Sequence, residues 1–246
     1  MLQNDFVYYA DGMKKAILFL MLILLPVAAY EVYSPESFRY KNSEPNLLFV
    51  VDFSNSMSER LENEPKFNLV KKVLNRVLPE ISPDTKVGMR VYGHNCNLLA
   101  FQACRSSELI VPLELNSTGK IQSAISKLRP RGMTPITYSL KQAVKKDFEQ
   151  TEGQKHIILL TDGGENCDES PCDYAISLVK SRRDINIDVI AFDVEDSDDL
   201  EQLKCTADVT GGQFVEAKTN AQLVQSLENL ILPHKQVEAL LWGKNQ

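Results

Sequence analysis

The stretch LLFVVDFSNS, residues 47–56, decides the fold. It begins with five apolar residues in a row, which predict a central β-strand buried on both faces. Asp52 follows directly, and Ser54 and Ser56 occupy every second position after it. In an extended loop these three side chains can turn to one side. Because ligands of open parallel sheets bind beyond the carboxyl ends of strands, this loop is a candidate binding site.

Strand and helix patterns alternate through the rest of the chain. A second apolar strand is expected at 156–160, and Pro112 suits only an edge strand or a strand end. Helices follow from apolar spacings of three and four residues, and Ser117 or Thr118 is the expected N-cap of the second helix. We therefore predict an α/β fold, a Rossmann-like doubly wound, mostly parallel sheet of about six strands with helices on both faces. The other strands are expected at 86–92, 108–113, 187–192 and 213–216.

Composition and charge fit one soluble domain and argue against nucleic-acid binding. Apolar residues make up 43% of the 246 residues and charged residues 24%, so a sizeable core is possible. The net charge is −6, and the Lys pairs at 71–72 and 145–146 are too short to form a phosphate-binding cluster. We expect no nucleic-acid partner.

The N-terminus resembles a secretion signal. Met13 and two lysines precede ten apolar residues, 16–25, and the small residues up to Ala29 suit cleavage. The apolar run is shorter than the roughly 20 residues of a membrane-spanning helix. An uncleaved inner-membrane anchor at 16–29 and a buried core helix are the alternatives, and the true start is Met1 or Met13. We expect a secreted or periplasmic protein.

The expected organisation has four parts. Residues 1–29 form an N-terminal extension with the signal or anchor, and residues 30–45 form a polar linker. The folded domain spans 46–232. Residues 233–246 form a tail with the apolar spacing of an amphipathic helix, which either packs on the domain or binds a partner.

The five cysteines agree with export. Short sequence spacings in an exported chain favour the disulfides Cys96–Cys104 and Cys167–Cys172, which leave Cys205 over. Buried free thiols and a zinc site are the alternatives, although the chain has no C-x-x-C motif.

Three loops carry oxygen ligands that suit a hard cation. They are 52–56, 132–136 just before the third helix, and 161–165 directly after the second apolar strand. A Mg²⁺ ion prefers such oxygen ligands, and a metal held mainly by neutral hydroxyls can still accept a carboxylate from outside. The candidate ligands are two carboxylates and three hydroxyls: Asp52, Asp162, Ser54, Ser56 and Thr134.

Each of these loops also has a simpler interpretation. Thr134 can merely cap the helix after Pro135, and Asp162 with Gly163 can merely form a turn. Glu165 either assists the site or is a solvated loop acid. His94 is more often a packed or hydrogen-bonded residue than a ligand.

The motif Asp52-x-Ser54-x-Ser56, together with Thr134 and Asp162, resembles the metal-ion-dependent adhesion site of von Willebrand factor type A domains. The resemblance extends over 46–231 in element order. It implies a bound Mg²⁺, Mn²⁺ or Ca²⁺ ion, with hydroxyl ligands from Ser54, Ser56 and Thr134 and carboxylates from Asp52 and Asp162, directly or through water. It also implies a protein partner that offers a Glu or Asp carboxylate as a further ligand.

A secreted bacterial subset of that family resembles this chain more closely. The shared stretches are RVYGH, TPI, TDGGE and TGG at 90–94, 134–136, 161–165 and 210–212. The resemblance therefore favours an extracytoplasmic role.

The sequence alone is compatible with three classes of function. The first is a metal-dependent protein-binding module for adhesion or assembly, with the loop 95–103 choosing the partner. The second is a structural or accessory subunit of an envelope complex, with a purely stabilising metal. The third, a metal-dependent hydrolase, is disfavoured because an aspartyl phosphatase needs a second acid where this chain has Ser54. No G-x-S-x-G, H-E-x-x-H or G-x-x-x-x-G-K motif is present, so we expect no catalytic residues and no enzyme.

Overall fold

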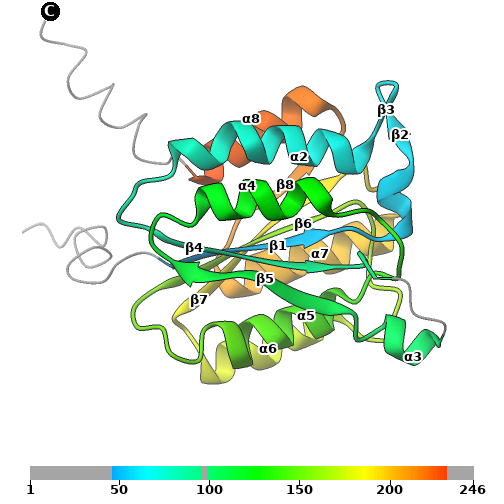
Figure 1. The fold of residues 1–246 in the computed structure, drawn as a ribbon. Coiled ribbons are helices and arrows are strands. Elements are labelled where there is room, and N and C mark those ends of the chain that lie inside the picture. The colour runs from blue at the N-terminus through cyan, green and yellow to red at the C-terminus, as the bar shows by residue number, and fades with distance from the viewer. Residues whose placement is uncertain (1–45, 96–98, 232–246) are drawn as a thin grey trace, which may run out of the picture. The chain divides into compact units, whose positions relative to one another are not determined.

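A computed structural model describes residues 46–95 and 99–231, which form an α/β domain (Figure 1). Its central sheet has six strands in the order β5-β4-β1-β6-β7-β8. Every neighbouring pair is parallel except β4 and β5, which are antiparallel. The predicted Rossmann-like fold class is therefore confirmed. The strands are β1 (Asn46–Asp52), β4 (Lys86–Tyr92), β5 (Ser107–Glu114), β6 (Lys155–Thr161), β7 (Ile185–Phe192) and β8 (Phe214–Ala217).

Helices cover both faces of this sheet (Figure 1). One face is covered by α2 (Lys66–Val77), α4 (Thr118–Lys127) and α8 (Asn220–Ile231). The other is covered by α5 (Ile136–Gln142) with its π-helical continuation η3 (Ala143–Asp147), by α6 (Pro171–Ser181) and by α7 (Ser197–Thr210). The short elements are η1 (Asn55–Ser58), η2 (Leu78–Glu80), α3 (Ala100–Ala103) and the two strands β2 (Arg60–Leu61) and β3 (Glu64–Pro65).

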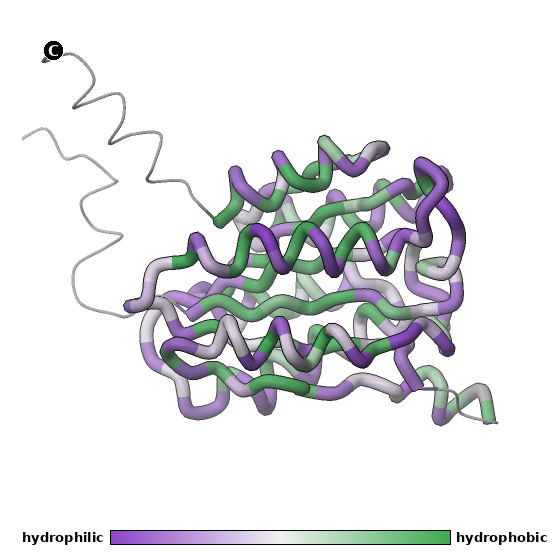
Figure 2. Tube along the Cα trace, turned by 45° about the horizontal axis from the view of Figure 1, so that its top comes forward, coloured by the Kyte–Doolittle hydropathy of each residue, from purple (hydrophilic) through white to green (hydrophobic). Residues whose placement is uncertain are grey.

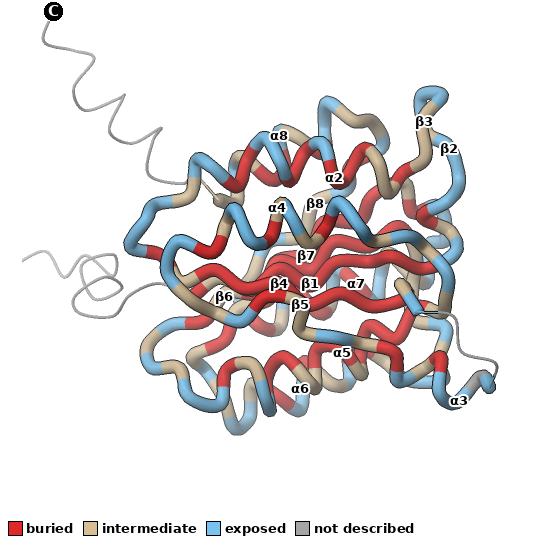
Figure 3. The backbone as a smooth tube through the Cα atoms, in the orientation of Figure 1, coloured by how far each residue is buried: buried red, intermediate tan, exposed pale blue. Residues whose placement is uncertain are grey.

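Strand β1 shows why the sheet needs helices on both sides. Phe49 and Val51 are fully buried in the core under α2, α4 and α8. Leu48 and Val50 are fully buried in the opposite core, under α5 and α7. Each such side chain contributes about 1.5–3 kcal/mol when it leaves water. The hydrophobic strands lie at the centre of Figure 2, and the same strands are buried in Figure 3.

The position of β1 brings two predicted loops together. β1 lies between β4 and β6, so the chain passes to one side of it first and returns to the other side later. Val51 is in register with Leu160 of β6, and Asp52 with Tyr92 of β4. The loops that follow β1 and β6 therefore begin side by side at the carboxyl edge of the sheet, where an open α/β fold binds ligands.

Local predictions had mixed outcomes. Pro112 lies on β5, an edge strand, as predicted, and α7 ends at Gly211, whose φ is 71°. Ser117 is the N-cap residue of α4, as predicted, but its hydroxyl donates to the Val87 carbonyl (2.5 Å) and makes no cap hydrogen bond. The β2–β3 hairpin had no strand pattern and was not predicted.

Several predictions lie outside the described residues. These are the signal or anchor at 1–29, the linker at 30–45, Cys96 and the tail at 233–246. Within the ranges that are described, no helix combines the length and the apolar character needed to cross a membrane.

Candidate metal centre

Asp52 is the most deeply held residue of the candidate site. Its side chain is fully buried at the end of β1. One carboxylate oxygen accepts a hydrogen bond from the Ser54 amide (2.6 Å). The other accepts from the Thr161 hydroxyl (2.8 Å) and the Tyr92 hydroxyl (3.3 Å). Donors from three strand ends thus fix the orientation of a carboxylate that would otherwise be free to rotate.

The two serines connect Asp52 to Asp162. Ser54 Oγ lies 3.0 Å from Ser56 Oγ, and Ser56 Oγ donates to Asp162 Oδ1 (2.7 Å). Ser54 is 1% exposed and Asp162 5% exposed, so this chain of oxygens lies just under the surface. Four of the five candidate ligands are therefore linked by direct hydrogen bonds.

The loop that carries Thr134 is attached to both other loops through its backbone. Gly132 pairs with Ser54 in a parallel bridge, and the Asn55 amide donates to the Gly132 carbonyl (3.0 Å). On the other side, the Thr134 amide donates to Asn166 Oδ1 (2.7 Å). These contacts place the buried Thr134 between the first and third loops. Its role as a metal ligand stays a prediction.

Two glycines allow this close approach of loops. A Cβ on Gly132 would lie 2.8 Å from the Asn95 carbonyl oxygen. Gly93 has a φ of 71°, and a Cβ there would lie 2.5 Å from the Ser54 amide nitrogen. A larger residue would need a shift of the Ser54 backbone at Gly93 and of the Asn95 backbone at Gly132.

The two buried carboxylates of the site, Asp52 and Asp162, favour a bound cation. Burial, and next the charge of Asp162, raise the pKa of Asp52 to about 7. Burial also raises the pKa of Asp162, against the opposing effects of Ser56 and Lys66. Two buried carboxylates in repulsion, surrounded by hydroxyls, fit a divalent cation, whose charge would cancel theirs. The residues present therefore suit the predicted metal.

One charged group at this site, Lys66, was not predicted from the sequence. Its ammonium lies 3.0 Å from Asp193 Oδ2, 3.3 Å from Asp162 Oδ2 and 3.4 Å from Glu59 Oε2. A signal was available, because Lys66 lies four and eight residues before Val70 and Leu74 and so shares the buried face of α2.

The simpler interpretations of the loop residues can now be compared with the structure. Thr134 does not cap α5, whose N-cap residue is Pro135 and makes no side-chain cap bond. Instead Glu165 accepts from the Thr137 amide (2.7 Å) and the Cys167 amide (3.0 Å), so it is a half-buried structural acid. His94 is hydrogen-bonded, with Nε2 3.0 Å from Glu108, as its commoner interpretation predicted.

The predicted disulfide pairing is wrong. Cys104 is bonded to Cys167 and Cys172 to Cys205, across sequence separations of 63 and 33 residues. The prediction failed because closeness in sequence does not measure closeness in an α/β fold. Cys104 follows α3 and meets the loop after β6, while Cys172 on α6 faces Cys205 on the packed helix α7. The zinc alternative is wrong for these four residues as well.

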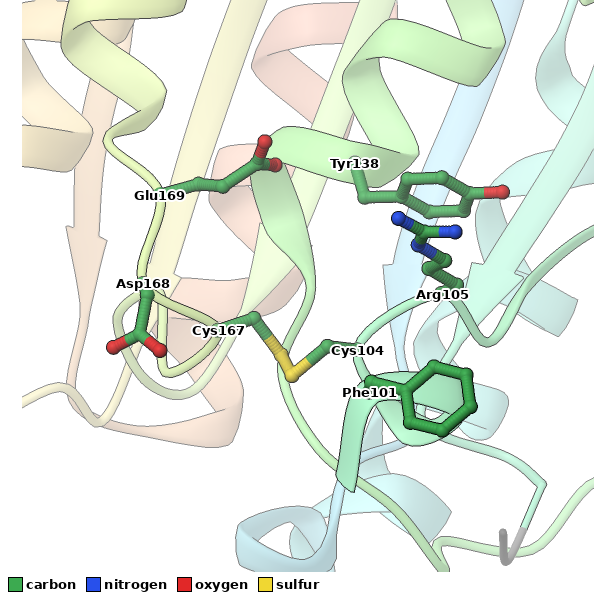
Figure 4. Close-up of a pocket in the computed structure, with 7 residues that line it drawn as sticks. All are labelled: Phe101, Cys104, Arg105, Tyr138, Cys167, Asp168 and Glu169. Atoms are coloured by element: carbon green, nitrogen blue, oxygen red, sulfur yellow. A yellow bond between two sulfur atoms is a disulfide. The ribbon is translucent and has the colours of Figure 1, made fainter. Parts of the chain in front are cut away.

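The Cys104–Cys167 disulfide forms part of the wall of a groove of about 500 Å³ (Figure 4). Figure 4 shows the rings of Phe101 and Tyr138 on one side of the disulfide, with Arg105 beside Tyr138. Tyr138 lies on α5, which begins two residues after the candidate ligand Thr134, and Cys167 lies in the loop after β6 that also carries Asp162. The groove and the three loops thus share one end of the domain.

The family model of the von Willebrand factor type A domain matches residues 46–230. The chain belongs to the von Willebrand factor type A domain family. Domains of this family are generally non-enzymatic interaction modules, and they bind protein ligands through a divalent cation at the metal-ion-dependent adhesion site. The matched range includes all three loops described above.

Relatives of this von Willebrand factor type A domain include two uncharacterized proteins of Bacillus subtilis strain 168. YwmD is 29% identical over 88% of this chain and 96% of its own length. YwmC is 31% identical over 71% of this chain and 77% of its own.

A solved structure with the same fold comes from the mussel byssus. It is proximal thread matrix protein 1, in a form whose metal-ion-dependent adhesion site motif is occupied by zinc. The TM-score is 0.59 at 23% identity, over 76% of this chain and 45% of that one, so this chain spans less than half of that protein. A likeness at this identity shows the fold alone.

Proposed function

We propose that this protein is an extracytoplasmic metal-dependent binding module for adhesion or assembly, which holds an acidic residue of a protein partner through a divalent cation. The observation that carries the proposal is the buried pair Asp52 and Asp162, joined through the amide and hydroxyl of Ser54 and the hydroxyl of Ser56. Mg²⁺ is the proposed ion, with Mn²⁺ or Ca²⁺ as substitutes.

Each residue has a distinct part in this proposal. Asp52 and Asp162 supply the negative charge, directly or through water, and Ser54, Ser56 and Thr134 supply neutral oxygens. When bound, the cation supplies a Lewis-acid coordination position for an outside carboxylate. Thr161 and Tyr92 keep Asp52 oriented by donating to the oxygen that Ser54 does not occupy.

The groove of Figure 4 supports a role in choosing the partner. Phe101, at 62% exposure, and Leu99, at 52%, are large apolar side chains open to solvent in and next to α3. This agrees with the expectation that the loop 95–103 selects the partner, because exposed apolar groups mark interaction surfaces.

The extracytoplasmic location is supported by the disulfides. Two of them occur among the described residues, and disulfides persist mainly in oxidising compartments. The apolar run at 16–25 supplies the expected export signal, either cleaved or kept as an inner-membrane anchor.

Selection from a random peptide library tests the proposal. The library is bound in Mg²⁺ and eluted with EDTA, and the protein is compared with its Asp52→Ala, Ser54→Ala double variant. We expect the eluted peptides to share an Asp or Glu, and their amide versions to lose binding. The exposed Asp208 lies outside the three loops, so Asp208→Asn is the matched control and should bind like the unmodified protein. Peptides that bind equally in EDTA, or equally to the double variant, would sink the proposal.

The same acid pair supports a second candidate, a structural subunit with a purely stabilising metal. Mg²⁺ would then raise the melting temperature because it binds only the folded state. The two candidates separate on one result, since only the first predicts metal-dependent capture of acidic peptides.

A further inference from the structure

The ammonium of Lys66 is buried beside the candidate metal site. Its side chain is 5% exposed, which is unusual for a lysine unless it is paired. Three carboxylates surround its ammonium, Asp193 at 3.0 Å, Asp162 at 3.3 Å and Glu59 at 3.4 Å. Lys66 is therefore a positive charge held by ion pairs under the surface of the domain.

Lys66 shares a carboxylate with the metal site. Asp162 receives the Ser56 hydroxyl on Oδ1 and faces the Lys66 ammonium with Oδ2 (3.3 Å). Asp52, in contrast, is hydrogen-bonded by neutral donors, the Ser54 amide and two hydroxyls. One acid of the pair thus has a counter-charge without any metal, and the other does not.

We propose that Lys66 is a built-in counter-cation of this site. It stabilises the metal-free domain by neutralising Asp162, and the same positive charge weakens the binding of a divalent cation. The inference rests on the metal site of the proposed function and adds a regulation to it. Occupancy of the site becomes sensitive to the surrounding metal concentration, because the ion must bind against the repulsion of the Lys66 ammonium, which stays beside the site.

Two further acids explain how both cations can be accommodated. Asp193 Oδ2 is the closest carboxylate to the ammonium (3.0 Å), and Glu59 Oε2 lies 3.4 Å away. Both belong to loops outside the candidate ligand set. They can retain the ammonium when a metal takes over the charge of Asp162, so Lys66 need not move into solvent.

The test is calorimetric titration of the full chain with Mg²⁺ and with Mn²⁺. Lys66→Met should bind each ion on the order of tenfold more tightly than the unmodified protein, as expected for the loss of one nearby charge. Its melting temperature in EDTA should fall, because the buried Asp162 loses its counter-charge and keeps only the neutral Ser56 hydroxyl as a donor. Tighter binding by a less stable protein is a combination that a merely structural lysine would not produce.

Lys71→Met is the matched control. Lys71 lies on the same helix, is 8% exposed, and donates to the Ser126 and Leu128 carbonyls instead of to an acid. Its replacement should lower the melting temperature and leave the metal affinity unchanged.

Asp193→Asn changes the metal affinity in the opposite direction. With its closest acid removed, the Lys66 ammonium should pair more strongly with Asp162, so metal binding should weaken several-fold. Asp193 is 27% exposed, and this variant therefore keeps the inference testable if Lys66→Met does not fold.

The outcomes separate this inference from the proposed function. Metal affinity of Lys66→Met equal to or below that of the unmodified protein overturns the inference alone. Metal binding by Lys66→Met without binding by the unmodified protein supports it and overturns the proposed function. No metal binding by either protein overturns both.

Discussion

Replacing Asp52 with Asn should stabilise the metal-free protein at alkaline pH while abolishing metal binding. The folded-state pKa of Asp52 is raised from 3.8 to about 7 by burial and by the charge of Asp162. Between those two values the folded state holds a proton that the unfolded state has lost. Stability therefore falls as pH rises through this window, and the cost is complete above pH 7.

The magnitude follows from the size of the shift. Each pKa unit corresponds to 1.36 kcal/mol, so the cost approaches about 4 kcal/mol at pH 8 as an upper bound and is less than half of that at pH 5. Asn carries no charge, and its carbonyl can still accept from the Ser54 amide. Its NH₂ group can donate to Thr161, whose hydroxyl has a second acceptor in the Gly163 carbonyl (2.8 Å).

We expect Asp52→Asn to recover about 1–3 kcal/mol at pH 8, which raises the melting temperature by roughly 2–12 °C for a domain of this size. Thermal denaturation in EDTA at pH 5 and pH 8 measures it, with the exposed Asp208→Asn as control. The reasoning is refuted if the variant is not more stable at pH 8, or if its advantage is the same at both pH values.

Three other predictions test separate parts of the site. The Mg²⁺ affinity should be about tenfold weaker at pH 6 than at pH 8, because Asp52 must lose its proton to bind a cation; a flat calorimetric profile would contradict this. Gly132→Ala should weaken Mg²⁺ binding at least several-fold, because its Cβ would meet the Asn95 carbonyl at 2.8 Å and displace the loop of Thr134; unchanged affinity would show that the loop is not required. Replacing Cys104 and Cys167 together by Ser should cost about 2–4 kcal/mol of unfolding free energy, measured by denaturant titration, since the bond closes a long loop; a loss below 1 kcal/mol would mean that the loops hold their positions without it.

The fold could be predicted from the sequence because its signals are local. The apolar runs at 47–51 and 156–160 mark strands buried on both faces, whatever the rest of the chain does. The site residues next to the ends of these strands could be predicted for the same reason. Asp52 and Asp162 lie at the ends of strands that an α/β fold places side by side, and the structure joins them through Ser54 and Ser56.

The disulfides and Lys66 could not be predicted in the same way, because they depend on distant contacts. Cys104 meets Cys167 only because two loops lie at one end of the sheet. The helical spacing places Lys66 on a buried face, but its ion partner Asp193 lies 127 positions later and no local pattern identifies it. The β2–β3 hairpin is too short to show an alternating pattern.

A crystal of the protein grown with Mn²⁺ tests the central claim most directly, because anomalous scattering locates the ion independently of any assumed ligand. The account predicts one peak at the carboxyl edge of the sheet, enclosed by Asp52, Ser54, Ser56, Thr134 and Asp162, and no peak for Asp52→Asn. A fully occupied peak elsewhere, or no peak at saturating Mn²⁺, would contradict it.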